Sequence, residues 1–185
     1  MLSTGLAAVS FVPLVAAADD SSAEVAQLVD AKFDYRLAYP ADWKETGKPV
    51  KTHLQEVLYS SPNGYPKFGV TIDPVTIDSL EAFGTLDQVT ERVLAVEATR
   101  DGVKTVTLRS NAAQAADAEA GAPSYYTIEY VTESSRGTKL FCCKYCIAKR
   151  KLYVLQTQAK LDAFDSDGGV RAQVRSIIGS FTVTT

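Results

Sequence analysis

Segments in which apolar and polar residues alternate recur along this chain, and only two stretches carry the spacing of an amphipathic helix. The clearest alternation runs from Phe33 to Tyr39, where every second residue is apolar, and Pro40 ends it. Further candidate strands fall at 56–60, 68–72, 103–110, 125–131, 140–147 and 152–158. Many strands joined by short turns, with few helices, predict an α+β fold: a central antiparallel β-sheet flanked by helices.

The two expected helices lie at about 86–100 and 170–178. Thr85 and Gln88 form a capping box before the first, and Gly102 follows its end. Its predicted buried face consists of Leu86, Val89, Val93 and Val96. The second helix is expected to stop at Gly179 and to bury Val170, Val174, Ile177 and Ile178.

Composition is that of one soluble domain. The 185 residues are 46% hydrophobic and 22% charged, with a formal net charge of −3. This charge excludes a protein held to nucleic acid by bulk electrostatics. No apolar run approaches the ~20 residues that a transmembrane helix needs.

The N-terminal segment has the pattern of a targeting signal. Residues 1–18 are uncharged, residues 5–18 (GLAAVSFVPLVAAA) are apolar, and the three alanines fit an A-x-A cleavage site. We expect 1–18 to be removed, 19–32 to form a short, partly helical arm with Val25, Leu28 and Val29 on one side, and 33–185 to form the folded domain.

No catalytic motif is recognisable. The single histidine, His53, stands in a loop-like stretch, and neither a nucleophile elbow, a phosphate-binding loop nor a dinucleotide fingerprint is present. The sequence therefore predicts a protein that is not an enzyme.

Three cysteines lie within the predicted strand 140–147. Strand alternation places Cys143 on one face with Phe141, and Cys142 and Cys146 on the other. Cys142 and Cys146 are then about 13 Å apart, too far for a disulfide. We expect no intrachain disulfide, while a redox or metal role remains the less favoured alternative.

Two kinds of charged cluster are candidate sites. Asp162, Asp165 and Asp167 offer carboxylates to a hard cation such as Ca²⁺, but the favoured interpretation is a loop in which Asp165 or Asp167 caps the next helix. Two basic clusters are candidate docking sites for an acidic partner: a loop and the turn between the last two strands. The residues are Lys48, Lys51 and His53 in the loop, and Lys149, Arg150 and Lys151 at the turn.

Several segments together resemble the PsbP family. They are 33–43 (FDYRLAYPADW), 68–72 (FGVTI), 83–85 (FGT), 124–130 (SYYTIEY), 151–159 (KLYVLQTQA) and 180–183 (SFTV), in the family's order along nearly all of 33–185. The resemblance implies a PsbP-like α/β/α sandwich in the chloroplast thylakoid lumen. A chloroplast transit peptide ahead of the signal-like segment would explain why residues 1–4 carry no basic residue; an atypical signal is the alternative.

The resemblance further implies an extrinsic protein, peripheral to the membrane, on the lumenal face of a photosystem and beside its other extrinsic subunits. PsbP itself caps photosystem II and helps the oxygen-evolving complex retain calcium and chloride, with no tightly bound cofactor expected here. Other PsbP-like and PsbP-domain proteins serve photosystem I assembly or a chloroplast dehydrogenase-like complex, which is the alternative. Lys139 and Leu140 stand where a metal-binding relative has histidine, so metal binding is not carried over.

Overall fold

The computed structural model describes residues 24–47 and 52–184. The predicted cleavage segment 1–18, together with Lys48 and Lys51 of the loop cluster, lies outside this range. No helix in the described part of the chain is both long and apolar enough to cross a membrane.

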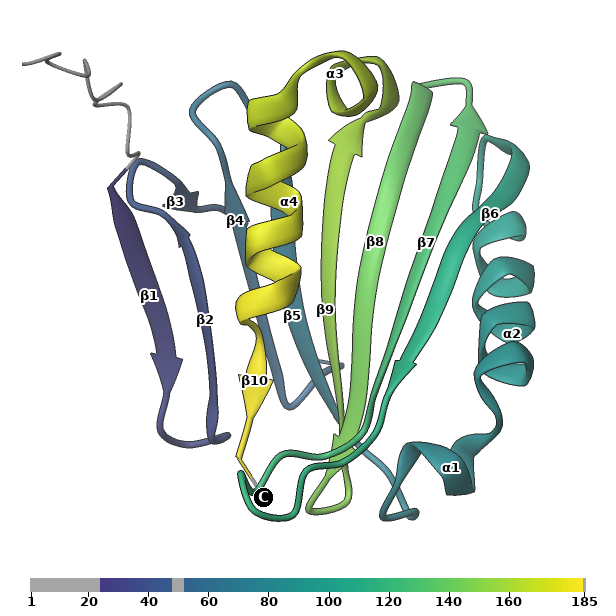
Figure 1. Ribbon diagram of the computed structural model, residues 1–185. Helices are drawn as coiled ribbons and strands as arrows, with labels where there is room; N and C mark the ends of the chain where they lie inside the picture. Colours follow the sequence, from purple (N-terminus) through teal and green to yellow (C-terminus); the bar gives the residue numbers. More distant parts are fainter. Residues whose placement is uncertain (1–23, 48–51, 185) are drawn as a thin grey trace, which may run out of the picture.

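A large antiparallel sheet forms the centre of the molecule (Figure 1). Its strand order is β3-β4-β5-β9-β8-β7-β6. The strands are β3 (Lys44–Glu45), β4 (Gln55–Ser60), β5 (Lys67–Pro74), β6 (Val103–Gln114), β7 (Tyr125–Ser134), β8 (Gly137–Ala148) and β9 (Lys151–Lys160). All six expected strands of this sheet are present, most of them longer than the sequence indicated.

Two layers cover the sheet. On one face lie helix α4 (Gly168–Ser180) and a small sheet of β1 (Val25–Asp30), β2 (Tyr35–Pro40) and β10 (Thr182–Val183), as Figure 1 shows. On the other face lies helix α2 (Leu86–Ala98), with the short α1 (Leu80–Phe83) before it. The helix α3 (Leu161–Ser166) connects β9 to α4. The predicted α+β sandwich is confirmed.

Each layer seals its own hydrophobic core. The core under α4 and the small sheet contains Phe68, Leu155 and Ile177, and the core under α2 contains Leu80, Val89 and Ile128. In the first core Phe68 stacks on Tyr59 with ring centroids 5.1 Å apart. Burial of aromatic rings at this spacing adds stabilisation beyond the area they remove from water.

Strand β8 divides the two cores. Cys142 and Cys146 are buried in the first core, while Phe141, Cys143 and Ile147 are buried in the second. This is the alternation that the sequence predicted. What the sequence did not indicate is that both faces of the strand are apolar, because helical layers cover both.

The N-terminal arm corrects one prediction. Residues 25–30, expected to be partly helical, form strand β1, which pairs antiparallel with β2 from Val25↔Pro40 to Asp30↔Tyr35. Val25 and Val29, placed by helical spacing on one face with Leu28, both point to solvent and are 65% and 64% exposed. The spacing of these residues also fits the period-two alternation of a strand. Hydrogen bonding to β2 makes the segment a strand rather than a helix.

The helices depart from expectation in three details. The Thr85–Gln88 capping box is present, but Val96, expected on the buried face, is 62% exposed and borders a cavity between α2 and the sheet. Gly179 does not stop α4, which continues to Ser180. The segment expected to be a polar loop begins with α3, and its Phe164 is buried.

Candidate functional site

The basic turn lies between β8 and β9, as predicted. Lys149 and Arg150 have φ values of 49° and 58°, the left-handed backbone of a tight two-residue hairpin turn. Lys149 forms a 3.0 Å ion pair with Asp34, and the Arg150 guanidinium donates to the carbonyl of Thr76 at 3.2 Å. Lys151 donates to the carbonyl of Lys149. The side chains of Lys149 and Arg150 are nevertheless 49% and 65% exposed, which leaves them accessible to a partner.

His53, the one described member of the loop cluster, is paired with a carboxylate. Its Nδ1 lies 2.7 Å from Oδ1 of Asp73, and both side chains are about one-third exposed, 31% and 33%. This contact ties the segment before β4 to the end of β5. The docking role predicted for His53 with Lys48 and Lys51 stays a prediction, since both lysines lie outside the described residues.

The three candidate metal ligands are engaged separately. Asp167 caps α4 by accepting hydrogen bonds from the amides of Gly169 and Val170, as the favoured interpretation predicted. Asp162 accepts from the amide of Ala163, and Asp165 pairs with Arg109 at 3.0 Å. Within 24–47 and 52–184, no group of three or more acidic, His or Cys side chains is placed to hold a metal ion. The structure therefore does not bring these aspartates together as a metal site.

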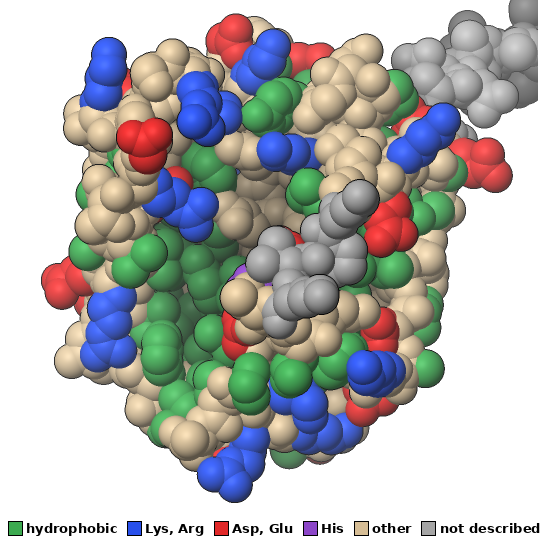
Figure 2. All heavy atoms as spheres, turned by 180° about the vertical axis from the view of Figure 1, so that it is seen from behind, with side chains coloured by type: hydrophobic (Ala, Val, Ile, Leu, Met, Phe, Trp, Pro, Cys, Tyr) green, Lys and Arg blue, Asp and Glu red, His purple; other side chains and the backbone are tan. Residues whose placement is uncertain are grey.

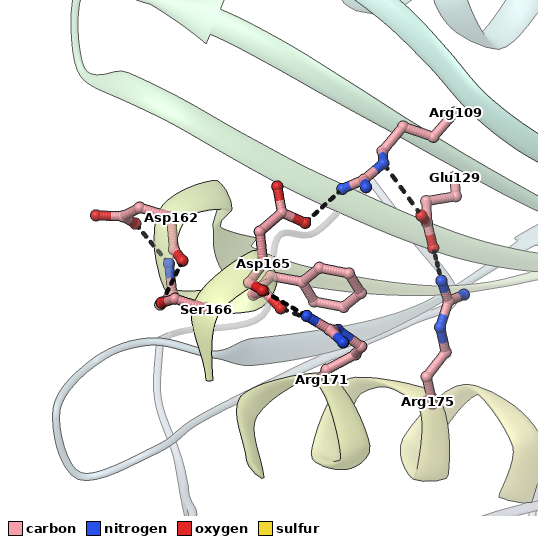
Figure 3. Close-up of polar contacts among 9 residues, drawn as sticks. Arg109, Glu129, Asp162, Asp165, Ser166, Arg171 and Arg175 are labelled. Carbon is pink, nitrogen blue, oxygen red and sulfur yellow. Dashed lines mark hydrogen bonds and ion pairs between the residues drawn. The ribbon is translucent and has the colours of Figure 1, made fainter. Parts of the chain in front are cut away.

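An arginine network surrounds Asp165 instead (Figure 3). The carboxylate of Glu129 on β7, 4% exposed, faces Arg109 of β6 and Arg175 of α4. The guanidinium groups of Arg109, Arg171 and Arg175 lie 5.6–5.8 Å from the ring of Phe164. These contacts fasten α3 and α4 to the large sheet, and cation–π attraction adds to the ion pairs.

Sequence reasoning missed this network because its members are far apart in the chain. Arg109 and Asp165 are 56 residues apart, and no local spacing joins them. A second missed feature is Lys144, buried in the middle of β8, whose Nζ donates to the carbonyl of Phe181 at 3.0 Å and lies 4.3 Å from the ring of Tyr125. Both groups hold the C-terminal helix in place.

The comparisons with known proteins agree with this architecture. The model of the PsbP family matches residues 23–183. The chain belongs to the PsbP family. This confirms the resemblance on which the sequence analysis relied, and the match extends over the whole described fold apart from its last residue, Thr184.

Individual relatives are distant in sequence. Over 164 residues the chain is 24% identical to "PsbP domain-containing protein 2, chloroplastic" of Arabidopsis thaliana, covering 87% of this chain and 67% of that protein. The solution structure of cyanobacterial PsbP (CyanoP) from Synechocystis sp. PCC 6803 aligns with a TM-score of 0.70 at 20% identity, covering 92% of this chain and 99% of that one.

The fold also extends beyond the family. The Ran-binding protein Mog1p of Saccharomyces cerevisiae aligns with a TM-score of 0.55 at 10% identity, covering 88% of this chain and 96% of that one. At such low identity the likeness shows a shared fold alone.

The cysteine thiols provide a first test of the buried strand. Burial raises the pKa of Cys142 and that of Cys143 to about 12 each, so that only about one thiol in ten thousand is ionised at pH 8. We expect all three thiols to react with a thiol reagent such as Ellman's reagent only as fast as the protein unfolds, and to react at once in denaturant. Fast labelling of the folded protein, or a mass lower by two hydrogens, would contradict this placement.

The arginine network provides a second test. In Arg175→Met the contact with Phe164 is largely kept, but buried Glu129 loses its closer ion-pair partner. Because Arg175 is 49% exposed, solvent screens part of the pair, and we expect a loss of about 2 kcal/mol in the free energy of unfolding.

The matched control for Arg175→Met is Arg136→Met, which removes an exposed arginine that forms no ion pair within the described chain. Urea unfolding measures both variants. A control that loses as much stability as Arg175→Met would rule out the ion pair as the cause.

Proposed function

We propose that this protein is a non-catalytic extrinsic subunit on the lumenal side of the thylakoid membrane. Its host is a photosystem, most simply photosystem II, where it stabilises the oxygen-evolving complex and its retention of calcium and chloride. The observation that carries the proposal is the PsbP-family match over residues 23–183. The absence of a helix able to cross a membrane, in the part of the chain that is described, agrees with a peripheral position.

The chemistry of the described residues supports a binding role rather than catalysis. The His53–Asp73 pair could in principle act as a general base, but the structure provides it with no hydrogen-bonded nucleophile within the described chain. The cysteine thiols are buried and protonated at neutral pH, which opposes a redox function.

The second candidate function is a PsbP-domain assembly or stability factor for photosystem I or another thylakoid complex. It is favoured by the arm that precedes the entry strand. PsbP proteins that retain ions are expected to have a long flexible arm there, whereas residues 25–30 of this chain are hydrogen-bonded to β2 along their full length.

Separating membrane complexes tests the first proposal against the second. Thylakoids solubilised in mild detergent are resolved on a native gel, and the chain is detected with an antibody. We expect it to comigrate with photosystem II. Comigration with photosystem I or another complex would replace the first candidate by the second, and migration alone after crosslinking would contradict both.

The docking surface that we favour is the turn between β8 and β9. Lys149, Arg150 and Lys151 give a net-acidic protein a local positive patch beside the β1–β2 hairpin, at the lower end of Figure 1. Because charges farther apart than about 8 Å are largely screened at physiological salt, binding to an acidic lumenal surface depends on such close contacts.

Changing Lys149, Arg150 and Lys151 together to glutamine should release the protein from membranes at lower salt than the parent, since the attraction that speeds association is lost. The control is the triple change Lys44→Gln, Lys104→Gln and Arg136→Gln, which removes the same charge from exposed residues elsewhere. Release at the parent's salt concentration, or equal early release of the control, would rule out the turn as the docking site.

A further inference from the structure

The face of the large sheet that carries α2 is only partly covered. The side chains of β4, β5 and β9 on this face are half-buried and line a groove beside the helix. It consists of two adjoining cavities of about 490 Å³ and 240 Å³, both bordered by Glu56, Thr71, Arg100, Val154 and Gln156. Figure 2 shows this face with a hollow lined by hydrophobic side chains and with lysine and arginine side chains gathered above it.

The polarity of the groove changes steadily along β9. Every second residue of this strand faces the groove, in the order Leu152, Val154, Gln156, Gln158 and Lys160. The strand thus passes from two apolar side chains, through two uncharged amides, to a cation over about 26 Å, at 3.3 Å per residue.

The apolar end lies between α2 and the sheet. Its lining includes Phe83, Val93 and Val96 from the helical side and Leu152 and Val154 from the sheet. Val96, which is 62% exposed and has no core to pack against, is part of this lining. Gly69 of β5 faces the middle of the groove, where a Cβ atom would lie 3.2 Å from the carbonyl oxygen of Val57.

Three lysines lie at the other end: Lys67 lines the smaller groove cavity, and Lys139 and Lys160 line the larger open cavity beyond it. Lys139 and Lys160 are directly opposite each other across β8 and β9, an arrangement of like charges that destabilises a sheet. Lys67 lies on the neighbouring strand β5, one position along, opposite Gln158. Within the described chain none of the three forms an ion pair with a carboxylate.

The environment of Tyr65 reflects the positive charge of these lysines. The ammonium groups of Lys67 and Lys139 lie 5.1 Å and 5.6 Å from the centre of its ring. Burial raises the pKa of the Tyr65 hydroxyl, but hydrogen bonding and charge from the two lysines outweigh it and hold the pKa below its usual value. The end of the groove is therefore suited to an anion.

Of the acidic residues near the groove, some lie at its apolar end or form ion pairs, and two lie beside the lysines. Asp73 and Glu56 lie at the apolar end, at the levels of Leu152 and Val154, and Asp73 is paired with His53. Glu97 forms a 2.8 Å ion pair with Arg100. Glu133 and Asp162, which form no ion pair within the described chain, line the open cavity at the cationic end together with Lys139 and Lys160.

The backbone of the groove floor offers no hydrogen bonds. Strands β5, β9 and β8 each have a hydrogen-bonded neighbour on both sides, so their amides and carbonyls are already used. A peptide lying in the apolar end would leave its own backbone groups unsatisfied, whereas an alkyl chain has none to satisfy. This distinguishes the two kinds of occupant that could fill a groove with an apolar end and a cationic end.

We propose that this groove binds one molecule of an acyl-chain amphiphile with an anionic headgroup. The alkyl chain lies between Val96 and Val154, the uncharged linkage faces Gln156 and Gln158, and the headgroup contacts Lys67, Lys139 and Lys160. The proposal rests on the geometry of the groove and is independent of the function proposed above.

Calorimetry with dodecyl phosphate below its micelle concentration tests this binding. We expect one molecule to bind per chain, and both dodecyl maltoside, which has the same alkyl chain but no charge, and inorganic phosphate, which has no chain, to bind at least tenfold more weakly. Failure of dodecyl phosphate to bind, or equal binding of the maltoside, would overturn the proposal.

Variants locate the site. Lys139→Gln with Lys160→Gln should weaken dodecyl phosphate binding about tenfold, because two charge-assisted contacts are lost. Val96→Glu should abolish binding while the protein stays folded, since the valine is exposed. The matched control, Lys44→Gln with Lys104→Gln, should bind as the parent does; unchanged binding by the first two variants would refute the site.

Flotation with phosphatidylglycerol vesicles distinguishes a ligand taken from a membrane from one that is free in solution. If the parent floats and Val96→Glu does not, the groove takes its ligand from a membrane; if neither floats while the parent binds dodecyl phosphate, it takes a free amphiphile. Flotation without any binding of monomeric dodecyl phosphate would show a membrane-surface patch and overturn the proposal.

Discussion

Packing on both faces of strand β8 is the constraint on which the rest of this structure depends. Cys142 and Cys146 face the core under α4, while Phe141, Cys143 and Ile147 face the core under α2. β8 also lies between β9 and β7 and pairs with both over most of its length. Because protein interiors are close-packed, a change in this strand affects both layers at once.

The polar residues of the interior follow from the same arrangement. Lys144 extends from β8 to the carbonyl of Phe181 beyond the end of α4, and Thr157 of β9 donates to the carbonyl of Cys142. Glu129 on the neighbouring strand anchors the same helix through Arg175. Buried polar groups with partners of this kind fix one orientation of α4, which hydrophobic contact alone does not specify.

This framework leaves two regions exposed for binding, one basic and the other partly apolar. The turn at Lys149 and Arg150 projects from the end of the β8–β9 hairpin, where it presents charge without disturbing either core. The groove beside α2 exists because that helix is too narrow to cover the half of the sheet formed by β4, β5 and β9. The two proposed sites, one at the end of the sheet and one on its exposed face, agree with the binding role that we propose for this chain.

Local patterns predicted the strands and the helix starts well, because period-two alternation and capping chemistry are properties of neighbouring residues. The Thr85–Gln88 capping box and the two faces of β8 are examples. The predictions that were wrong concerned residues whose structure depends on contacts with distant parts of the chain. The spacing of the valines of β1 fits either a helix or a strand, and pairing with β2 makes it a strand. Val96 continues the apolar stripe of α2 but borders an open cavity rather than the packed core. Neither the arginine network nor the lysine end of the groove has a local signal, since contacts between elements far apart in the sequence create both.

Hydrogen exchange of the backbone amides is the most direct test of the central place of β8. If packing on both faces holds the fold together, the amides of β8 and β9 exchange only through global unfolding, while those of β1 and β3, which are exposed edge strands, exchange through local opening at much lower free energy. Protection factors measured by NMR should therefore be highest in Phe141–Cys146 and fall toward both edges of the sheet. Protection in β1 equal to that in β8, or early exchange of the Cys142 and Cys143 amides, would contradict this account.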